Sequence, residues 1–270
     1  MRTFKSLAWR AIQSLKLERI VIVLRACALV NEPVVIALGE MRRRRGSVRR
    51  FTLRHSGHAV YLRSRSTDLN VLHEVFSYRG YDPPAQARIA LSRRPVAVDA
   101  GANIGLFTLF LCESVPGVKV TAFEPDSENV AIARRTLAPL IQSGQVELLE
   151  VAVGTCAGEI PFVAGRAMTS HRAVAGEPGT VRVRQVDVFE HLNGVGLLKL
   201  DIEGAEWDIL RDPRWSDRMP PSVVMEWHGV HDNQREPDPL EELKHLLSAA
   251  QVVQHTPFVP GVVGHLWAFR

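Results

Sequence analysis

The sequence predicts an α/β protein with a Rossmann-like, doubly wound and mainly parallel sheet, preceded by an N-terminal helical and hairpin extension. From residue 96 onward, short apolar runs alternate with segments of helical periodicity. That alternation is typical of parallel strands joined by right-handed helical crossovers. Acids or glycines directly follow several of the apolar runs. Ligands of such sheets bind beyond the carboxyl ends of the strands, so these residues are candidates for a site.

The composition of the 270-residue chain is that of a soluble globular protein, with 46% hydrophobic and 23% charged residues. Its three cysteines, Cys27, Cys112 and Cys156, are odd in number and far apart. This pattern indicates neither a disulfide framework nor a zinc knuckle. We therefore expect a reducing compartment and a cytoplasmic protein.

Charge is distributed unevenly along the chain. Residues 1–54 contain thirteen Lys or Arg and three Glu, a net charge of +10, whereas the whole chain carries +4. This asymmetry predicts a basic N-terminal extension over residues 1–54 and a mildly acidic Rossmann-like domain over residues 55–270.

Residues 1–30 have apolar positions that recur every three or four residues, which predicts an amphipathic helix. The more apolar part after Ile20 is interrupted by Arg25 and is too short to cross a bilayer. Charges within the apolar stretch also argue against a signal peptide. Two interpretations stay open: a helical cap that packs on the domain or forms a homo-oligomer, and a helix that contacts anionic lipid.

The arginine run at Arg42–Arg45 raises the question of nucleic-acid binding. Apart from Phe51, the interleaved aromatics of a base-stacking surface are absent, so no nucleic-acid partner is expected. Alternating residues on both sides of Ser56-Gly57 predict a short hairpin with a solvated basic face. Thr67 is placed to cap a following helix over residues 70–78.

The most informative stretch turns from an apolar strand into an apolar helix at Asp99, Gly101 and Gly105. Glycine permits a sharp bend and a close approach of backbone to ligand. The spacing matches neither a Walker loop nor the dinucleotide fingerprint. Asp99 would repel a phosphate and favour a cationic ligand. The alternative is an ordinary tight turn.

A second acid sharpens this hypothesis. Glu124 ends the predicted strand over residues 119–123, nineteen positions after Gly105. An acid at this place holds the ribose hydroxyls of ligands in doubly wound sheets. The alternative for Glu124 is a solvated strand end.

Three blocks of the sequence resemble a known family. VDAGANIGLFTL (98–109), AFEPDSEN (122–129) and LLKLDIEGAEWDIL (197–210) are similar to the FkbM-type methyltransferases. The similarity starts near residue 62 and extends to about residue 229. It implies a class I methyltransferase fold and the cofactor S-adenosyl-L-methionine (SAM). It also implies transfer of a methyl group to oxygen, often to a hydroxyl of a sugar or natural product.

The resemblance extends the candidate cofactor site. Ala102 and Asn103 in the first block and Pro125 in the second are expected to contact SAM together with the residues named above. A tyrosine lies near the cofactor pocket in this family, and Tyr81 is the candidate here. Ala152, at the end of a strand predicted over residues 146–153, is expected beside the adenine.

Methyl transfer to a hydroxyl benefits from a group that accepts the hydroxyl's proton. Candidates for catalysis are His228, Asp201 and Glu226, which follow late predicted strands, and His171 in the loop over residues 165–180. His228 has a suitable unperturbed pKa, about 6.5, and would act as the neutral imidazole.

A metal requirement is not expected, although it stays open. Glu226, His228, His231 and Asp232 could form a cluster, but their spacing fits no named metal motif. Asp201 and Glu226 could also hold a divalent ion if the fold brings them together.

The favoured function is O-methylation of a sugar, oligosaccharide or glycosylated metabolite. Two alternatives remain: N-methylation of a small metabolite, and a non-enzymatic basic binding module.

Overall fold

The computed structural model describes residues 19–42, 46–164, 171–172, 180–228, 230–231, 234–235, 239–248, 250–259 and 263–270. Most of the amphipathic helix predicted for residues 1–30 lies outside these ranges, and so does most of the loop over residues 165–180. The chain forms two compact units that meet in sequence between Arg79 and Gly80. Each unit is described separately.

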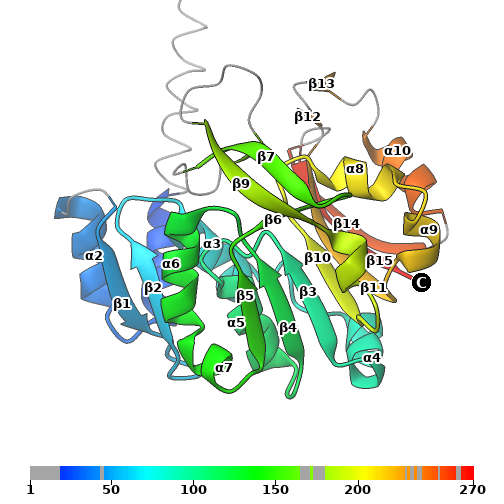
Figure 1. The fold of residues 1–270 in the computed structure, drawn as a ribbon. Coiled ribbons are helices and arrows are strands. Elements are labelled where there is room, and N and C mark those ends of the chain that lie inside the picture. The colour runs from blue at the N-terminus through cyan, green and yellow to red at the C-terminus, as the bar shows by residue number, and fades with distance from the viewer. Residues whose placement is uncertain are drawn as a thin grey trace, which may run out of the picture. The chain divides into compact units, whose positions relative to one another are not determined.

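The first unit combines helices with one hairpin (Figure 1). A helical segment over residues 19–29 precedes α2 (Pro33–Arg42). The predicted hairpin is present and pairs Phe51 with Val60. The remaining elements are β1 (Val48–Thr52), β2 (Ala59–Arg63), α3 (Asp68–Leu72) and the π-helical η1 (His73–Tyr78).

Two details of this unit differ from expectation. The predicted division at residue 54 would fall inside the β1–β2 hairpin and separate paired strands, so the unit continues to Arg79. Thr67 precedes α3, but its side chain makes no capping hydrogen bond. Instead, buried Asp68 accepts hydrogen bonds from the backbone nitrogen of Arg63 at 2.7 Å and from its guanidinium Nη2 at 2.8 Å. This pair links the hairpin to the helix.

The second unit contains the predicted α/β sheet. Seven strands run in the order β14-β15-β11-β10-β3-β4-β5. The five strands from β11 to β5 are parallel, and β15 runs antiparallel to β11. The strands are β3 (Val96–Ala100), β4 (Lys119–Phe123), β5 (Val146–Leu149), β10 (Leu197–Leu200), β11 (Ser222–His228), β14 (Gln251–Val259) and β15 (Val263–Phe269). This topology confirms the predicted mainly parallel sheet.

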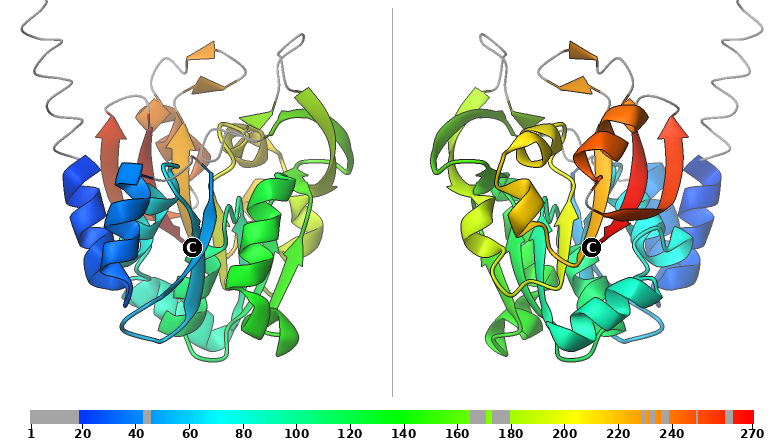
Figure 2. Two further views of the ribbon diagram at one scale, coloured as in Figure 1. Left: turned by 90° about the vertical axis from the view of Figure 1, so that its left-hand side faces the viewer. Right: turned by 90° about the vertical axis from the view of Figure 1, so that its right-hand side faces the viewer.

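A smaller four-stranded sheet stands over the carboxyl ends of these strands (Figures 1 and 2). Its order is β6-β9-β7-β8, from β6 (Ala152–Gly154), β7 (Gly158–Val163), β8 (His171–Arg172) and β9 (Thr180–Asp187). The single strand predicted over residues 146–153 is therefore wrong. The chain leaves the main sheet after Leu149, and β6 pairs with β9 in the other sheet.

Helices connect the strands as the alternation predicted. They are α4 (Ala85–Arg93), α5 (Leu106–Ser114), α6 (Ser127–Thr136), α7 (Ala138–Gln142), the 3₁₀ turn η3 (Val188–His191), α8 (Glu206–Arg211), α9 (Trp215–Arg218) and α10 (Pro239–Leu246). A short pair, β12 (Val230–His231) and β13 (Gln234–Arg235), follows β11. Among the described residues, no helix combines the length and apolar content that crossing a bilayer requires.

Close contact between two strand ends explains Gly101. Its φ is +85°, and a Cβ built on it would lie 1.8 Å from the carbonyl oxygen of Asp201. A hydrogen bond from Asp201 N to Ala100 O at 3.1 Å joins the same two strand ends, and Gly101 N donates to Phe123 O at the end of β4 at 3.0 Å. Only glycine allows the turn after β3 to pass so close to the end of β10.

This contact predicts that Gly101→Ala destabilises the protein more than a matched glycine substitution. Gly117 also has positive φ, +79°, but no atom lies within 4 Å of the place that a Cβ would occupy there. Gly117→Ala should cost only the left-handed backbone energy, about 1–2 kcal/mol. Gly101→Ala should cost ~3 kcal/mol or more, because the main chain at Asp201 must move. Urea unfolding of both variants measures the difference, and equal costs would contradict the steric explanation.

Candidate functional site

A pocket opens where β3, β4 and β10 end beneath the smaller sheet. The space between its walls is about 690 Å³, a volume that includes solvent at the open mouth. Its lining includes six of the twelve residues predicted for the site: Gly101, Asn103, Glu124, Pro125, Ala152 and Asp201. The convergence of strand ends therefore assembles residues that are far apart in sequence.

Glu124 is the buried acid of this pocket, with 5% of its surface exposed. One carboxylate oxygen accepts the backbone N–H of Asn103 at 2.7 Å, and the other accepts that of Asp126 at 2.9 Å. Burial raises the pKa of Glu124 to about 7, although these hydrogen bonds oppose the shift. The bonds hold the glycine turn in place and orient the carboxylate within the pocket.

An apolar surface forms another part of the lining. Val151, Ala152 and Val153 come from the segment that leaves the main sheet, and Ile160 and Phe162 come from β7. Such a surface suits a flat, weakly polar ring. The smaller sheet therefore contributes directly to the pocket.

Sequence reasoning missed Lys199, the only charged side chain of β10. Its Nζ lies 3.4 Å from Asp99 Oδ1 and 3.1 Å from Asp201 Oδ2, and it donates to the carbonyl oxygen of Gly101 at 2.6 Å. Burial lowers the pKa of this lysine, but Asp201 and Asp99 outweigh that effect and raise it. A lysine inside an apolar strand run requires a buried partner, which is the pattern that could have revealed it.

Asp99 lies outside the pocket lining. It is fully buried, accepts a hydrogen bond from Thr108 Oγ1 at 2.6 Å, and faces Lys199. Burial raises its pKa, whereas Lys199 and Thr108 counteract the shift. The cationic partner observed for Asp99 is thus a side chain of this protein, and direct contact with a cofactor stays a prediction.

Three other predicted residues also lie outside the lining. Ala102 is buried in the glycine turn, and Gly105 begins α5 at a φ of +82°. A Cβ on Gly105 would lie 2.9 Å from a Leu137 side-chain carbon. Tyr81 is buried, with ring centroids 5.2 Å from Phe107 and 4.4 Å from His265. Their cofactor roles stay predictions.

His228 is surrounded by carboxylates. Its Nδ1 lies 3.3 Å from Glu206, and its Nε2 lies 3.5 Å from Glu203 and 3.7 Å from Glu226. Glu206 is fully buried and accepts backbone N–H groups of Ile202 at 2.7 Å and Gly204 at 2.8 Å. Glu203 and Glu206 are further residues that sequence reasoning missed.

These neighbours alter the expected charge of His228. Burial alone would lower its pKa, but Glu206, Glu203 and Asp201 raise it to about 10. In the absence of another cation, the imidazole therefore holds its proton at neutral pH, which differs from the predicted neutral form. Burial and the charge of Asp201 raise the pKa of Glu203 to about 8.

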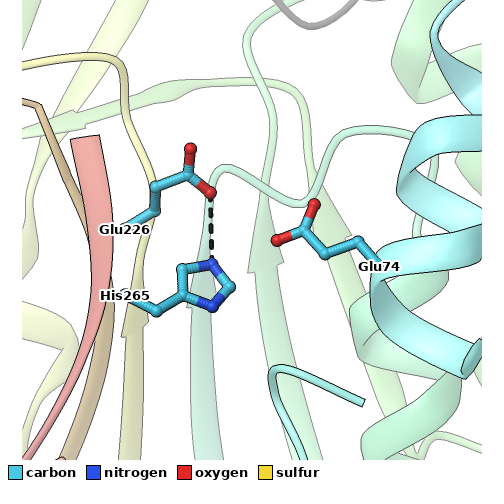
Figure 3. Close-up of side chains that lie close together, drawn as sticks. All are labelled: Glu74, Glu226 and His265. Carbon is cyan, nitrogen blue, oxygen red and sulfur yellow. Dashed lines mark hydrogen bonds and ion pairs between the residues drawn. The ribbon is translucent and has the colours of Figure 1, made fainter. Parts of the chain in front are cut away.

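Glu226 completes the arrangement. It is the fifth residue of β11, and its Oε2 lies 3.2 Å from Nε2 of His265 on the neighbouring β15 (Figure 3). Asp201, Glu226 and His228 each offer one atom that could bind a metal, and these three atoms lie within 4.8 Å of one another. The three residues predicted for catalysis are therefore brought together. His171 belongs to β8, but its side chain is not described, and Asp232 lies outside the described residues.

The Lys199 contacts predict a large stability loss when the ammonium is removed. Lys199→Met should destabilise the protein by about 3–5 kcal/mol, because Asp99 would remain buried without its partner. Adding Asp99→Asn should recover part of the loss. The control Lys244→Met, at an exposed ion pair, should stay within about 0.5 kcal/mol of wild type. Denaturant unfolding of Lys199→Met, Asp99→Asn, the double variant and Lys244→Met measures the four stabilities. If the costs of Lys199→Met and Asp99→Asn simply add in the double variant, the two residues are not energetically coupled and the prediction is contradicted.

Comparison with known proteins gives a family. The model of the Methyltransferase FkbM domain family matches residues 99–252. "Methyltransferase sdnD" of Sordaria araneosa is 28% identical over 179 residues, which cover 52% of this chain and 67% of that protein. "Methyltransferase 1" of Beauveria bassiana (strain ARSEF 2860) is 28% identical over 148 residues, covering 44% of this chain and 59% of that protein.

Solved structures also align with the chain. The crystal structure of methyltransferase FkbM from Methylobacillus flagellatus KT has a TM-score of 0.46 at 17% identity, covering 74% of this chain and 52% of that chain. A methyltransferase from Geobacter sulfurreducens has a TM-score of 0.39 at 16% identity, covering 75% and 88%. The family model matches more than half of the length of this chain, so the chain belongs to the FkbM methyltransferase family.

Proposed function

We propose that this protein is a SAM-dependent O-methyltransferase that acts on a hydroxyl of a sugar, oligosaccharide or glycosylated metabolite. One observation carries the proposal. A single pocket combines a buried carboxylate, an apolar surface and an acidic end. These features suit, in turn, a ribose, an adenine and a hydroxyl-bearing acceptor.

The residues present fit SAM. Oε2 of Glu124 accepts one backbone N–H and retains capacity for a ribose hydroxyl. Oε1 accepts a backbone N–H and a longer hydrogen bond from Asn129 Nδ2 at 3.4 Å, which a second ribose hydroxyl would replace. Ala152 and its apolar neighbours would contact the adenine. The bend at Gly101 keeps the pocket wall free of a side chain, and Asp201 supplies negative charge near a cationic methionine moiety. When bound, SAM supplies an electrophilic methyl group.

Asp201 and Glu203 line the acidic end of the pocket and would hold the acceptor there. A hydroxyl donates a hydrogen bond to a carboxylate, so these two side chains can orient the attacking oxygen. Asp201 is also placed to receive its proton, whereas Glu203, with its raised pKa, would do so only in its ionised form. His228 and Glu226 lie directly beside them and complete the proposed catalytic group.

Several adjacent carboxylates can accept hydrogen bonds, which favours a substrate with many hydroxyls over an apolar one. Carboxylates would also attract an amine, so N-methylation of a small metabolite remains the second candidate.

The reducing, cytoplasmic setting expected from the cysteines is part of the proposal, and Cys27, Cys112 and Cys156 form no disulfide in this structure. Ile20 and Leu24 are 55% and 64% exposed, which supports a role of the N-terminal segment in contact with lipid or a second copy.

The ribose assignment predicts that Glu124→Gln weakens binding of S-adenosylhomocysteine by at least about tenfold. An amide has one acceptor oxygen, so it cannot satisfy Asn103, Asp126 and two hydroxyls together. Glu150→Gln is the control, because Glu150 is exposed and its carboxylate lies as far as 3.5 Å from the guanidinium of Arg134. Titration calorimetry measures both affinities, and an unchanged affinity for Glu124→Gln would remove the assignment.

The raised pKa of Glu124 predicts a pH dependence of cofactor affinity. Its pKa of about 7 exceeds the ordinary value, so part of the protein carries a neutral Glu124 at pH 7. Ribose hydroxyls donate to the ionised form, so affinity should rise as pH increases from 6 to 8 and binding should release protons. For folding the sign is opposite: the stability contributed by protonated Glu124 is lost as pH rises through about 7. Calorimetry in buffers of different ionisation enthalpy measures the proton release, and proton uptake would contradict the assignment.

The function itself is tested with SAM carrying a ¹³C-labelled methyl group and a panel of sugar and amine acceptors. NMR of the product distinguishes methyl on oxygen from methyl on nitrogen. We expect O-methyl products that depend on Asp201 and Glu203. Exclusive N-methyl products would establish the second candidate, and cofactor binding without turnover of any acceptor would favour a non-enzymatic role.

A further inference from the structure

We infer that Asp201, Glu226 and His228 form a binding site for one divalent cation of the Mn²⁺ class. The three side chains come from the ends of neighbouring strands, Asp201 directly after β10 and the other two from β11. Their sequence spacing fits no linear metal motif because adjacent strands, not one loop, bring them together.

The distances suit a shared ion. Candidate ligand atoms of the three side chains lie within 4.8 Å of one another. Ligands about 2.0–2.2 Å from a metal lie roughly 3–4.4 Å apart, depending on whether they are adjacent or opposite. Glu226 Oε1 and His228 Nε2, for example, are 3.7 Å apart. This separation is too long for a hydrogen bond and close enough for two ligands of one cation.

Each proposed ligand also has an orienting partner outside the triad. Buried Glu206 faces Nδ1 of His228 at 3.3 Å, which directs Nε2 toward the other ligands. His265 lies 3.2 Å from the Oε2 atom of Glu226. Lys199 lies 3.1 Å from Asp201. Outer partners of this kind, above all a carboxylate behind a histidine, are characteristic of metal sites in proteins.

The chemical type of the three ligand groups limits which metal ions the site can bind. Two carboxylates and one imidazole combine hard oxygen donors with a borderline nitrogen donor, which suits Mn²⁺ and also admits Mg²⁺ or Zn²⁺. Glu203, 3.5 Å from His228, adds negative charge beside the site. The surrounding carboxylates favour a positive charge here, and a metal ion would compete with the imidazole proton for that role.

The role of the ion in catalysis rests on the proposed function, but its binding does not. Asp201 lies both in the pocket lining and in the triad, so a cation held there would face an acceptor oxygen in the pocket. It would then orient that oxygen and stabilise negative charge on it.

The experiment titrates Mn²⁺ into the full-length protein without cofactor or acceptor. Electron paramagnetic resonance of free Mn²⁺ and calorimetry give the stoichiometry and affinity. We expect one site, weakened at least about tenfold by Glu226→Gln and by His228→Gln. Glu242→Gln, at an exposed ion pair with Arg211, is the control and should bind like wild type.

The same samples are checked for folding by urea unfolding and for S-adenosylhomocysteine binding. Folded variants that retain cofactor affinity and lose the single Mn²⁺ site support the inference. Absence of binding by wild type to Mn²⁺, Mg²⁺ and Zn²⁺ would overturn it, as would equal Mn²⁺ affinity in the triad variants and the control. Either result leaves the methyltransferase proposal intact, whereas loss of cofactor binding by wild type would count against that proposal alone.

Discussion

The site depends on the ion pairs that the buried ammonium of Lys199 makes with two aspartates. The ammonium lies between Asp99 on β3 and Asp201 after β10, and it also donates to the carbonyl of Gly101. Without this charge, two carboxylates would face each other at the ends of neighbouring parallel strands. Burying a charge is costly unless partners compensate, so the three groups fix one another's positions. The lysine thereby positions the glycine turn and the acid that lines the pocket.

The ends of the strands then divide the pocket into distinct environments. Beyond β4, Glu124 is held by backbone N–H groups of the glycine turn and of the residues before α6. The smaller sheet adds an apolar surface through Ile160 and Phe162. Beyond β10 and β11, carboxylates gather around His228. This division supports the proposed function, in which the adenosine moiety of the cofactor lies near Glu124 and the apolar surface and a hydroxyl-bearing acceptor lies near the carboxylates.

Local patterns predicted much of this arrangement. Strand and helix periodicity predicted the parallel sheet, and Gly101 and Glu124 were expected at one site because carboxyl ends of strands converge. Contacts between distant segments were not predictable in the same way. Glu206 became important only through its distance to His228, and the apparent strand over residues 146–153 is split because β6 finds its partner in β9. Linear spacing likewise could not reveal a triad formed across two strands.

A crystal structure of the protein with bound S-adenosylhomocysteine would test the assignment of the pocket most directly. We expect ribose hydroxyls within hydrogen-bond distance of Glu124, the adenine against Ala152, and the sulfur directed toward Asp201 and Glu203. A ligand bound in this pocket with its ribose away from Glu124, or bound elsewhere on the protein, would contradict the central claim that the strand ends form a cofactor and acceptor site.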